Sequence, residues 1–201
     1  MITAFDGSSI DGSSTIAVVG WARHAPSWLN DTVAAWSTYG LALFAVLMVI
    51  AWWRARQVSA GAAVTALAVP LIVAGAFAVD AALKLVVRED RPCRSLHVTT
   101  LEACPAPDDW SFPSNHAAIA TAAAVALLLV SRALGVVAVP AAAAMVVSRV
   151  WVGAHYPHDV LAGVVVGALT ALLVLPAARA GAQRLAPRLA ATRLRPLLAA
   201  P

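Results

Sequence analysis

Ionisable side chains gather at three places in a chain whose charged residues make up only 12% of the sequence. The three segments are Lys84–Pro92, Phe112–His116 and Ser148–Asp159. They supply ammonium, guanidinium, imidazole and carboxylate groups, and such groups beside apolar helices are costly and usually functional. Cations that can hold an anion, next to imidazoles that can attack or carry a proton, indicate chemistry on a phosphate group.

Three cations are the candidate phosphate ligands: Lys84, Arg91 and Arg149. A guanidinium group matches phosphate oxygens in a bidentate way, and an ammonium group adds charge with less directional demand. Each cation taken alone has an ordinary alternative, which is snorkelling to a membrane interface or pairing with a local acid. Asp80 lies four residues before Lys84 and offers such a pair.

Ser114 and Asn115 precede His116 at the expected start of a helix. Free backbone N–H groups and the helix dipole favour an anion at such an N-terminus. An ordinary helix cap explains Ser114 almost as well, and His116 alone could be an interface histidine. These three residues therefore become site candidates because of the segments that accompany them.

His155 and Asp159 are four residues apart, so they share one face if this turn is helical. A carboxylate that accepts from one ring nitrogen leaves the other nitrogen free as a nucleophile. The alternative is a structural His–Asp cap of the following helix. His158 falls on a different face, and we expect it to be a surface residue.

Metal binding is the main chemical alternative for two histidines and an aspartate. The three neighbouring cations would repel a divalent ion, although Glu89 and Asp90 lie near in the sequence. We therefore expect neither a metal nor another cofactor.

The elements that position these residues must be membrane helices. Hydrophobic residues make up 61% of the 201 positions and the mean hydropathy is +0.81, whereas a soluble domain carries about 25% charged residues. A spanning helix needs about 20 mostly apolar residues. Five segments qualify: 33–53, 60–83, 114–131, 133–152 and 158–177.

The predicted fold class is therefore all-α: a polytopic membrane helix bundle with about five transmembrane helices and an N-terminal amphipathic interfacial helix. The interfacial helix is expected at 14–29, which is too short to span and carries two tryptophans. The expected organisation is an N-terminal segment 1–32, a membrane domain 33–177 with an active-site loop at 84–113, and an Arg-rich cytoplasmic tail 178–201.

The basic residues predict the orientation in the cell membrane. With the N-terminus outside, residues 54–59, the turn at Arg132 and the tail after 177 hold eight arginines and no acid. Because cytoplasmic loops are enriched in Lys and Arg, the three ionisable segments are expected on the extracytoplasmic face. The net charge of +4 does not indicate nucleic acid, because the cations form no dense run with interleaved aromatic residues.

Cys93 and Cys104 lie in the same predicted outer loop. In an oxidising compartment two such cysteines are candidates for a disulfide, and the alternative is a pair of free thiols. A bond would hold Arg91 and Arg94 near the helix ends.

Three motifs together resemble the type 2 phosphatidic acid phosphatase family, which includes the vanadium haloperoxidases and glucose-6-phosphatase. They are K-x(6)-R-P at 84–92, P-S-x-H at 113–116 and S-R-x(5)-H-x(3)-D at 148–159. They occur in the family order, and the resemblance covers about residues 60–177. Many specified residues at the correct spacing make a chance match negligible.

The resemblance implies a role for each matching position. His155 would attack phosphorus to form a phosphohistidine while Asp159 holds its ring. His116 would protonate the leaving oxygen and then activate the water that hydrolyses the intermediate. The phosphoryl oxygens would be bound without a metal by these groups: Lys84, Arg91, Ser114, Arg149 and the backbone near Asn115.

Asn115 departs from the family pattern, which usually has Gly there. The sequences of two segments, Ser111–His116 and Gly153–Asp159, resemble those of the bacitracin-resistance type of undecaprenyl pyrophosphate phosphatase. The expected substrate is thus a polyprenyl (undecaprenyl or decaprenyl) pyrophosphate within membrane lipid. The alternatives are a phosphatase for phosphatidic acid or phosphatidylglycerol phosphate and, more remotely, a non-catalytic transporter or anion-binding protein. The oligomeric state stays open.

Overall fold

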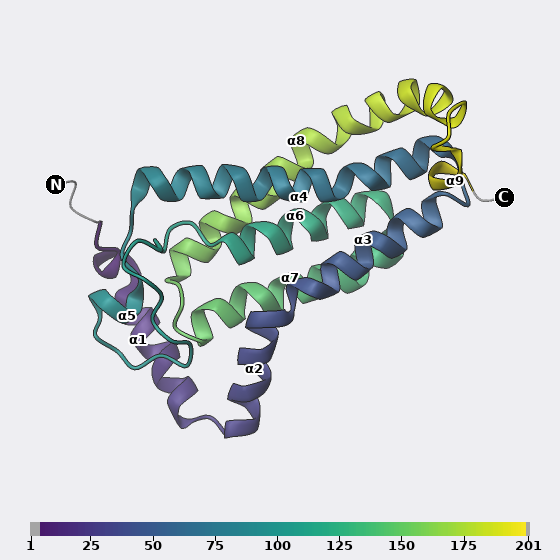
Figure 1. The fold of residues 1–201 in the computed structure, drawn as a ribbon. Coiled ribbons are helices and arrows are strands. Elements are labelled where there is room, and N and C mark those ends of the chain that lie inside the picture. Colours follow the sequence, from purple (N-terminus) through teal and green to yellow (C-terminus); the bar gives the residue numbers. More distant parts are fainter. Residues whose placement is uncertain (1–4, 200–201) are drawn as a thin grey trace.

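The structure of the protein is a computed structural model that describes residues 5–199. Figure 1 shows a bundle of helices with α1 and α5 at one end and α9 at the other. In chain order the helices of the described part are α1 (Ser8–His24), α2 (Ser27–Tyr39), α3 (Leu41–Ala55), α4 (Ala60–Val87), α5 (Pro92–Ser95), α6 (Asn115–Val130), α7 (Arg132–Trp151), α8 (Pro157–Ala190) and α9 (Arg195–Leu198).

Helix α6 lies at the centre of the bundle, packed against α3, α4, α7 and α8 (Figure 1). It is rich in buried alanine, and a helix that is apolar on every face belongs in the interior. Gly163 and Gly167 of α8 face it. A Cβ at Gly163 would sit 2.5 Å from the carbonyl oxygen of Ser114, so only glycine allows this approach. Small residues thus set how closely the start of α8 approaches the start of α6.

Three helices of the described residues are long and apolar enough to cross a membrane, and they are α4, α7 and α8. The all-α multi-pass architecture is confirmed, whereas the count of five spans is not. The first predicted span, 33–53, is instead two helices, α2 and α3, bent by 51°. The third predicted span is α6, whose 16 residues fall short of the roughly 20 needed to cross alone.

The bend between α2 and α3 occurs at Gly40. A Cβ there would lie 2.8 Å from the Trp36 ring and 2.8 Å from Cε of Met145, so a larger residue would separate α2 from α7. The bent pair can still count as a fourth span. Sequence hydropathy alone did not show this break, because the apolar run continues through it.

The predicted interfacial segment 14–29 is also divided. Helix α1 ends at His24 and α2 begins at Ser27, with Pro26 between them, where a proline cannot continue the first helix. Asn30 Nδ2 donates to the carbonyl of Ala22 at 2.8 Å and closes this corner. Location of the segment in the membrane interface stays a prediction. At the other end of the chain α8 does not stop at 177 but continues to Ala190.

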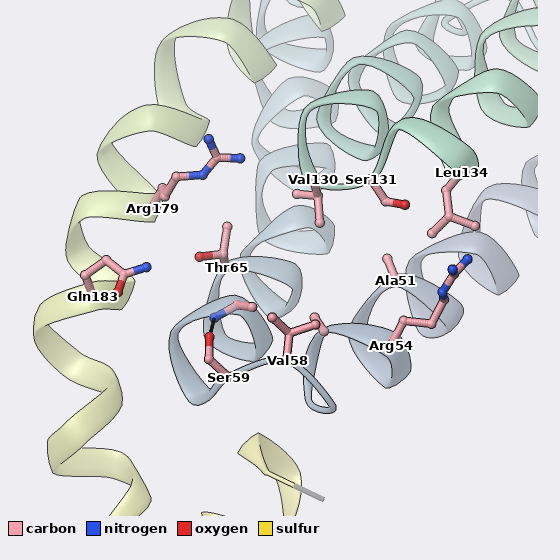
Figure 2. Close-up of a pocket in the computed structure, with 12 residues that line it drawn as sticks. Ala51, Arg54, Val58, Ser59, Thr65, Val130, Ser131, Leu134, Arg179 and Gln183 are labelled. Atoms are coloured by element: carbon pink, nitrogen blue, oxygen red, sulfur yellow. Dashed lines mark hydrogen bonds between the residues drawn. The ribbon is translucent and has the colours of Figure 1, made fainter.

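A cavity of about 390 Å³ opens at the end of the bundle away from α1 and α5. Figure 2 shows Arg179 and Gln183 of α8 on one side of it, and Arg54 of α3 on the other. Arg179 also donates to the carbonyl of Leu129 at 2.9 Å, which ties α8 to the end of α6. No residue of the three motifs lines this cavity. The arginines here and the motif residues therefore occupy opposite ends of the bundle.

Candidate active site

The three motif segments meet at one end of the bundle, beside α1 and α5 (Figure 1). Backbone and side-chain hydrogen bonds join them directly. Ser114 N donates to the Asp159 carbonyl at 3.1 Å, and Arg91 Nη1 donates to the Ala154 carbonyl at 2.9 Å. The end of α4, the start of α6 and the α7–α8 turn thus form the walls of one site.

Asp159 is the fully buried centre of this site. It occupies the first turn of α8, and its Oδ2 accepts from the backbone N–H of Tyr156 at 2.9 Å. The same oxygen accepts from Ser111 Oγ at 2.5 Å and lies 3.4 Å from Nδ1 of His155. The backbone and hydroxyl donors fix the carboxylate, so its position beside the imidazole does not depend on the imidazole itself.

His155 is 2% exposed, and its two ring nitrogens face different partners. Nδ1 faces Asp159, while Nε2 lies 3.4 Å from Nη1 of Arg91. Burial, with Arg91 and Arg149 nearby, holds the pKa of His155 well below its usual value. The ring is therefore neutral near pH 7, which is the form that can act as a nucleophile.

Arg91 and Lys84 are held by carbonyl oxygens of the loop that follows α5. Arg91 Nε donates to the Asp109 carbonyl at 2.9 Å, and its Nη2 pairs with the Asp109 carboxylate at 2.8 Å. Lys84 Nζ donates to the carbonyls of Trp110 and Ser111 at 2.7 and 3.0 Å. The alternative of an Asp80–Lys84 ion pair is not found in the described part of the chain, where both carboxylate oxygens of Asp80 are buried without a hydrogen-bond partner.

Arg149 completes the set of cations from the last turn of α7. Its Nη1 donates to Ser37 Oγ of α2 at 2.5 Å and pairs with Glu102 Oε2 at 2.9 Å. Arg149 is buried, yet its Nε has no hydrogen-bond partner within residues 5–199. A buried guanidinium N–H without an acceptor is costly, so this side chain keeps capacity for an anion. Ser148 makes only a local bond, to the carbonyl of Met145 at 2.7 Å.

Ser114 and Asn115 begin α6, but they do not cap it with their side chains. Ser114 Oγ and Asn115 Oδ1 are both buried and unpartnered among the residues described. Ser114 thus stands at the N-cap position of α6, but its side chain makes no capping hydrogen bond. His116 follows on the first turn, half-buried, and makes no hydrogen bond that the described residues provide. Three motif side chains are thus left free beside an N-terminus that favours anions.

Three residues that help to build the site were missed from the sequence as site residues. Ser111 fixes Asp159, Ser37 holds Arg149, and Glu102 pairs with Arg149. Ser111 could have been found, because it opens the Ser111–His116 segment. Ser37 gave no signal, because it contacts a residue 112 positions away in the sequence.

Cys93 and Cys104 are joined as a disulfide with a Cα–Cα distance of 5.9 Å. The bond closes the loop that carries Glu102 and lies next to Arg94. Arg94 is tied across the same loop, because its guanidinium donates to the carbonyls of Pro105 and Pro107. The disulfide therefore cross-links the loop from which Glu102 contacts Arg149.

Replacing both Cys93 and Cys104 by Ala should lower the free energy of unfolding by about 2–3 kcal/mol, because the unfolded chain gains the freedom of an 11-residue separation. Thermal unfolding in detergent would measure the loss. Reductant should lower the stability of the wild type and leave the variant unchanged. Equal stability of the two proteins would show that the cross-link does not support the loop.

His158 is not the surface residue that the sequence suggested. Its Nδ1 lies 2.8 Å from Asp11 Oδ1 of α1, and its Nε2 lies 2.9 Å from Glu89 Oε1. The ring also stacks against Tyr156 and Phe112, with centroid distances of 5.3 and 5.9 Å. The face that points away from His155 is therefore covered by α1, which hydropathy and spacing could not reveal.

One group of side chains in the described residues has the spacing of a metal site: Glu89, His158 and Asp159, whose ligand atoms lie within 4.8 Å of one another. It differs from the two-histidine alternative considered above, because neither His116 nor His155 belongs to it. Apart from this group, the site consists of the buried neutral imidazole of His155, the three cations and the N-terminus of α6. Such an arrangement can bind a phosphate group and attack it.

The protein is a multi-pass membrane helix bundle with the residues of the three motifs gathered at one end of it. Residues 63–181 match the PAP2 superfamily. The chain belongs to this superfamily. All three motifs lie within the matched part, while α1, whose Asp11 contacts His158, lies outside it.

Two known proteins similar to this chain are phosphatases by name. The decaprenylphosphoryl-5-phosphoribose phosphatase of Mycobacterium tuberculosis is 42% identical over 105 residues, which are 50% of this chain and 56% of that protein. The undecaprenyl-diphosphatase BcrC of Bacillus subtilis is 30% identical over 154 residues, 75% of each chain. The chain thus spans about half the length of the mycobacterial relative and three quarters of the Bacillus one.

A solved structure shares the fold. The transmembrane PAP2-type phosphatidylglycerolphosphate phosphatase from Bacillus subtilis aligns with a TM-score of 0.59 at 21% identity, over 81% of this chain and 83% of that one. At this identity the likeness concerns the helix bundle alone. It supports the multi-pass architecture described above.

Proposed function

We propose that this protein hydrolyses a polyprenyl pyrophosphate to the monophosphate and phosphate, through a phosphohistidine, on the extracytoplasmic face of the cell membrane. The observation that carries this proposal is the setting of His155. The ring is buried and neutral, with Asp159 at Nδ1 and Arg91 at Nε2. Nε2 therefore faces the cationic side of the site, where a phosphate would bind.

In the first step Nε2 of His155 attacks the terminal phosphorus, and the bond from phosphorus to the bridging oxygen breaks. His116, whose pKa is lowered by burial and by the nearby cations, takes up a proton when the anionic substrate binds and gives it to the departing prenyl phosphate. Asp159 accepts the Nδ1 hydrogen bond and stabilises the positive charge that develops on the ring. The anionic transition state is stabilised by the three cations and by the N-terminus of α6.

In the second step a water molecule attacks phosphorus, and the bond from phosphorus to Nε2 breaks. His116, now neutral, takes the proton of that water, and phosphate leaves. Both steps use groups of the chain alone, so the mechanism requires no metal ion.

An apolar groove of about 340 Å³ supports a lipid substrate. Thr121 of α6, Val146 of α7 and Val164 of α8 line it. Thr121 lies five residues after His116, and Val146 lies three residues before Arg149. The groove therefore begins about one turn of helix from the phosphate-binding groups. An isoprenoid chain in this groove would place its phosphates at the site.

Filling the groove should reduce turnover of long-chain substrates. Ala143 is exposed in the groove, so Ala143→Trp adds bulk without disturbing the core. We expect kcat/KM for undecaprenyl pyrophosphate to fall about 10-fold, roughly 1.4 kcal/mol, while that for a short-chain prenyl pyrophosphate changes little. The matched control is Ala133→Trp, exposed near the other end of α7 and outside the groove. Equal losses for long and short chains would contradict binding of the tail here.

The orientation is supported by the positions of the arginines. Arg54 and Arg179 line the cavity of Figure 2, at the end of the bundle opposite to the site. If this end faces the cytoplasm, as the positive-inside rule predicts, the site faces outward. A single cysteine introduced at exposed Asp108, next to the site, should react with a membrane-impermeant thiol reagent in intact cells. Reaction only after lysis would reverse the orientation.

The substrate is tested by phosphate release from purified enzyme on a lipid panel, with and without chelator. The expected order places polyprenyl pyrophosphate above phosphatidic acid and phosphatidylglycerol phosphate, with activity that persists in chelator. Decaprenylphosphoryl-5-phosphoribose is a second candidate, because the relative named for it is 42% identical. Faster release from the phosphoribose lipid would favour this second function. Activity lost in chelator and restored by a metal would overturn the metal-free mechanism.

A further inference from the structure

Behind the proposed catalytic pair lies a cluster that the mechanism does not use. It consists of His158, Glu89 and Asp11, together with the second carboxylate oxygen of Asp159. Oδ2 of Asp159 faces His155, whereas its Oδ1 lies 3.4 Å from Nε2 of His158. Asp159 thus connects the catalytic histidine on one side with this cluster on the other.

The cluster holds more negative than positive charge. Three carboxylates surround one imidazole, and the ion pairs of Glu89 and Asp159 in the described part of the chain are with histidines alone. Glu89 is 1% exposed and Asp159 is fully buried. Glu89 Oε2 and Asp159 Oδ1 are buried oxygens without any hydrogen-bond partner from residues 5–199. Buried carboxylates without donors are costly, and one imidazolium cannot neutralise three carboxylates, so the cluster keeps a net negative charge that favours a cation.

The geometry points to a divalent transition-metal site of the zinc class, formed by His158 Nε2, Glu89 and Asp159 Oδ1. The ligand atoms of these residues lie within 4.8 Å of one another. Zinc takes imidazole and carboxylate ligands, and three protein ligands leave a fourth position for water. Binding exchanges the Nε2 proton for the cation, and the proton leaves to water.

Two features hold the imidazole ready for a metal. Asp11 Oδ1 lies 2.8 Å from Nδ1, so the other ring nitrogen donates to a carboxylate, as it does in most histidines that bind metal. Asp11 Oδ2 also accepts from the backbone N–H of His158 at 2.8 Å. The stacked rings of Tyr156 and Phe112 fix the plane of the imidazole. The ring therefore needs little reorganisation to present Nε2.

Occupancy of this site would inhibit the proposed reaction. A cation on Oδ1 withdraws negative charge from Oδ2, which weakens the hydrogen bond that orients His155 and supports its charge. This inhibition rests on the proposed function, whereas binding of the metal does not. The site lies on the side of Asp159 away from the Nε2 of His155, so a bound metal would take no part in the attack on phosphorus.

The test is binding of Co²⁺ and Zn²⁺ to the purified full-length protein in detergent. We expect one equivalent of Co²⁺ to give the visible absorption of a four-coordinate site and to be displaced by Zn²⁺. His158→Gln should abolish it, Glu89→Gln should weaken it strongly, and Asp11→Asn should weaken affinity about 10–100-fold. His24→Gln, at an exposed histidine on α1, is the matched control and should bind as the wild type does.

Zn²⁺ should also inhibit phosphate release from the wild type and the His24→Gln protein, and not from the folded His158→Gln or Glu89→Gln protein. Absence of Co²⁺ absorption in the wild type, or equal absorption in His158→Gln, would overturn the site and leave an imidazolium ion pair in its place. If the protein releases no phosphate at all, the proposed function fails while the absorption still reports on the metal site.

Discussion

Replacing His155 by Ala should reduce phosphate release by at least about 10⁴-fold, to the rate without enzyme. The imidazole is the group proposed to form a bond to phosphorus, and among residues 5–199 it is the one side chain that contacts both Asp159 and Arg91. Burial and the nearby cations keep the pKa of this ring well below its usual value, so the wild type has the reactive form at neutral pH. Initial rates on undecaprenyl pyrophosphate would measure the effect.

The matched control is His24→Ala, which removes an exposed imidazole of α1 and should leave the rate unchanged. Binding of the substrate analogue vanadate to the His155→Ala protein would show that the cations still assemble. A folded His155→Ala protein that releases phosphate at a tenth of the wild-type rate or more would rule out this residue as the nucleophile.

Asp159→Asn should lower kcat by about 10³–10⁴-fold with a smaller change in KM. The carboxylate accepts from Tyr156 N and Ser111 Oγ and faces Nδ1 of His155. An amide oxygen in this position can still accept hydrogen bonds but carries no negative charge, so it no longer stabilises the positive charge that develops on the His155 ring. Steady-state kinetics on the lipid substrate would separate kcat from KM.

Ser111→Ala provides the graded comparison, because it removes one donor to Asp159 and leaves the charge. We expect a loss of about 10-fold, close to the value of one charge-assisted hydrogen bond. If Asp159→Asn were no worse than Ser111→Ala, the carboxylate would serve only to cap α8, which was the structural alternative for this pair.

Much of the site was predictable from sequence because its chemistry is local. Lys84, Arg91, Ser114 and Arg149 each stand at a helix end or in a short turn, where spacing along the chain fixes the position in space. The overall class followed from composition, since so few charged residues exclude a soluble domain. The arginines are concentrated in residues 54–59, the turn at Arg132 and the tail after 177. This distribution predicted that these segments lie on the side opposite to the motifs, and Figure 1 shows them at the opposite end of the bundle.

The remaining features depend on contacts between distant segments, which local patterns do not contain. The bend at Gly40 arises because Met145 of α7 packs where a Cβ would be. Helix α6 is shorter than a span because helices surround it rather than lipid. His158 was misplaced for the same reason: its partner Asp11 lies 147 residues away in the sequence.

Asn115 remains the position at which the choice of substrate is most open to experiment. Its Oδ1 is buried and unpartnered among the described residues, beside the equally free Oγ of Ser114.

The most direct test of the account is to trap the covalent intermediate. Enzyme mixed with terminally ³²P-labelled polyprenyl pyrophosphate is quenched in alkali within one turnover and digested to peptides. We predict one labelled peptide that contains His155, with a label stable to alkali and lost in acid. The label should be absent from the His155→Ala protein. Full turnover of substrate without label at His155, or label on another residue, would contradict the phosphohistidine mechanism.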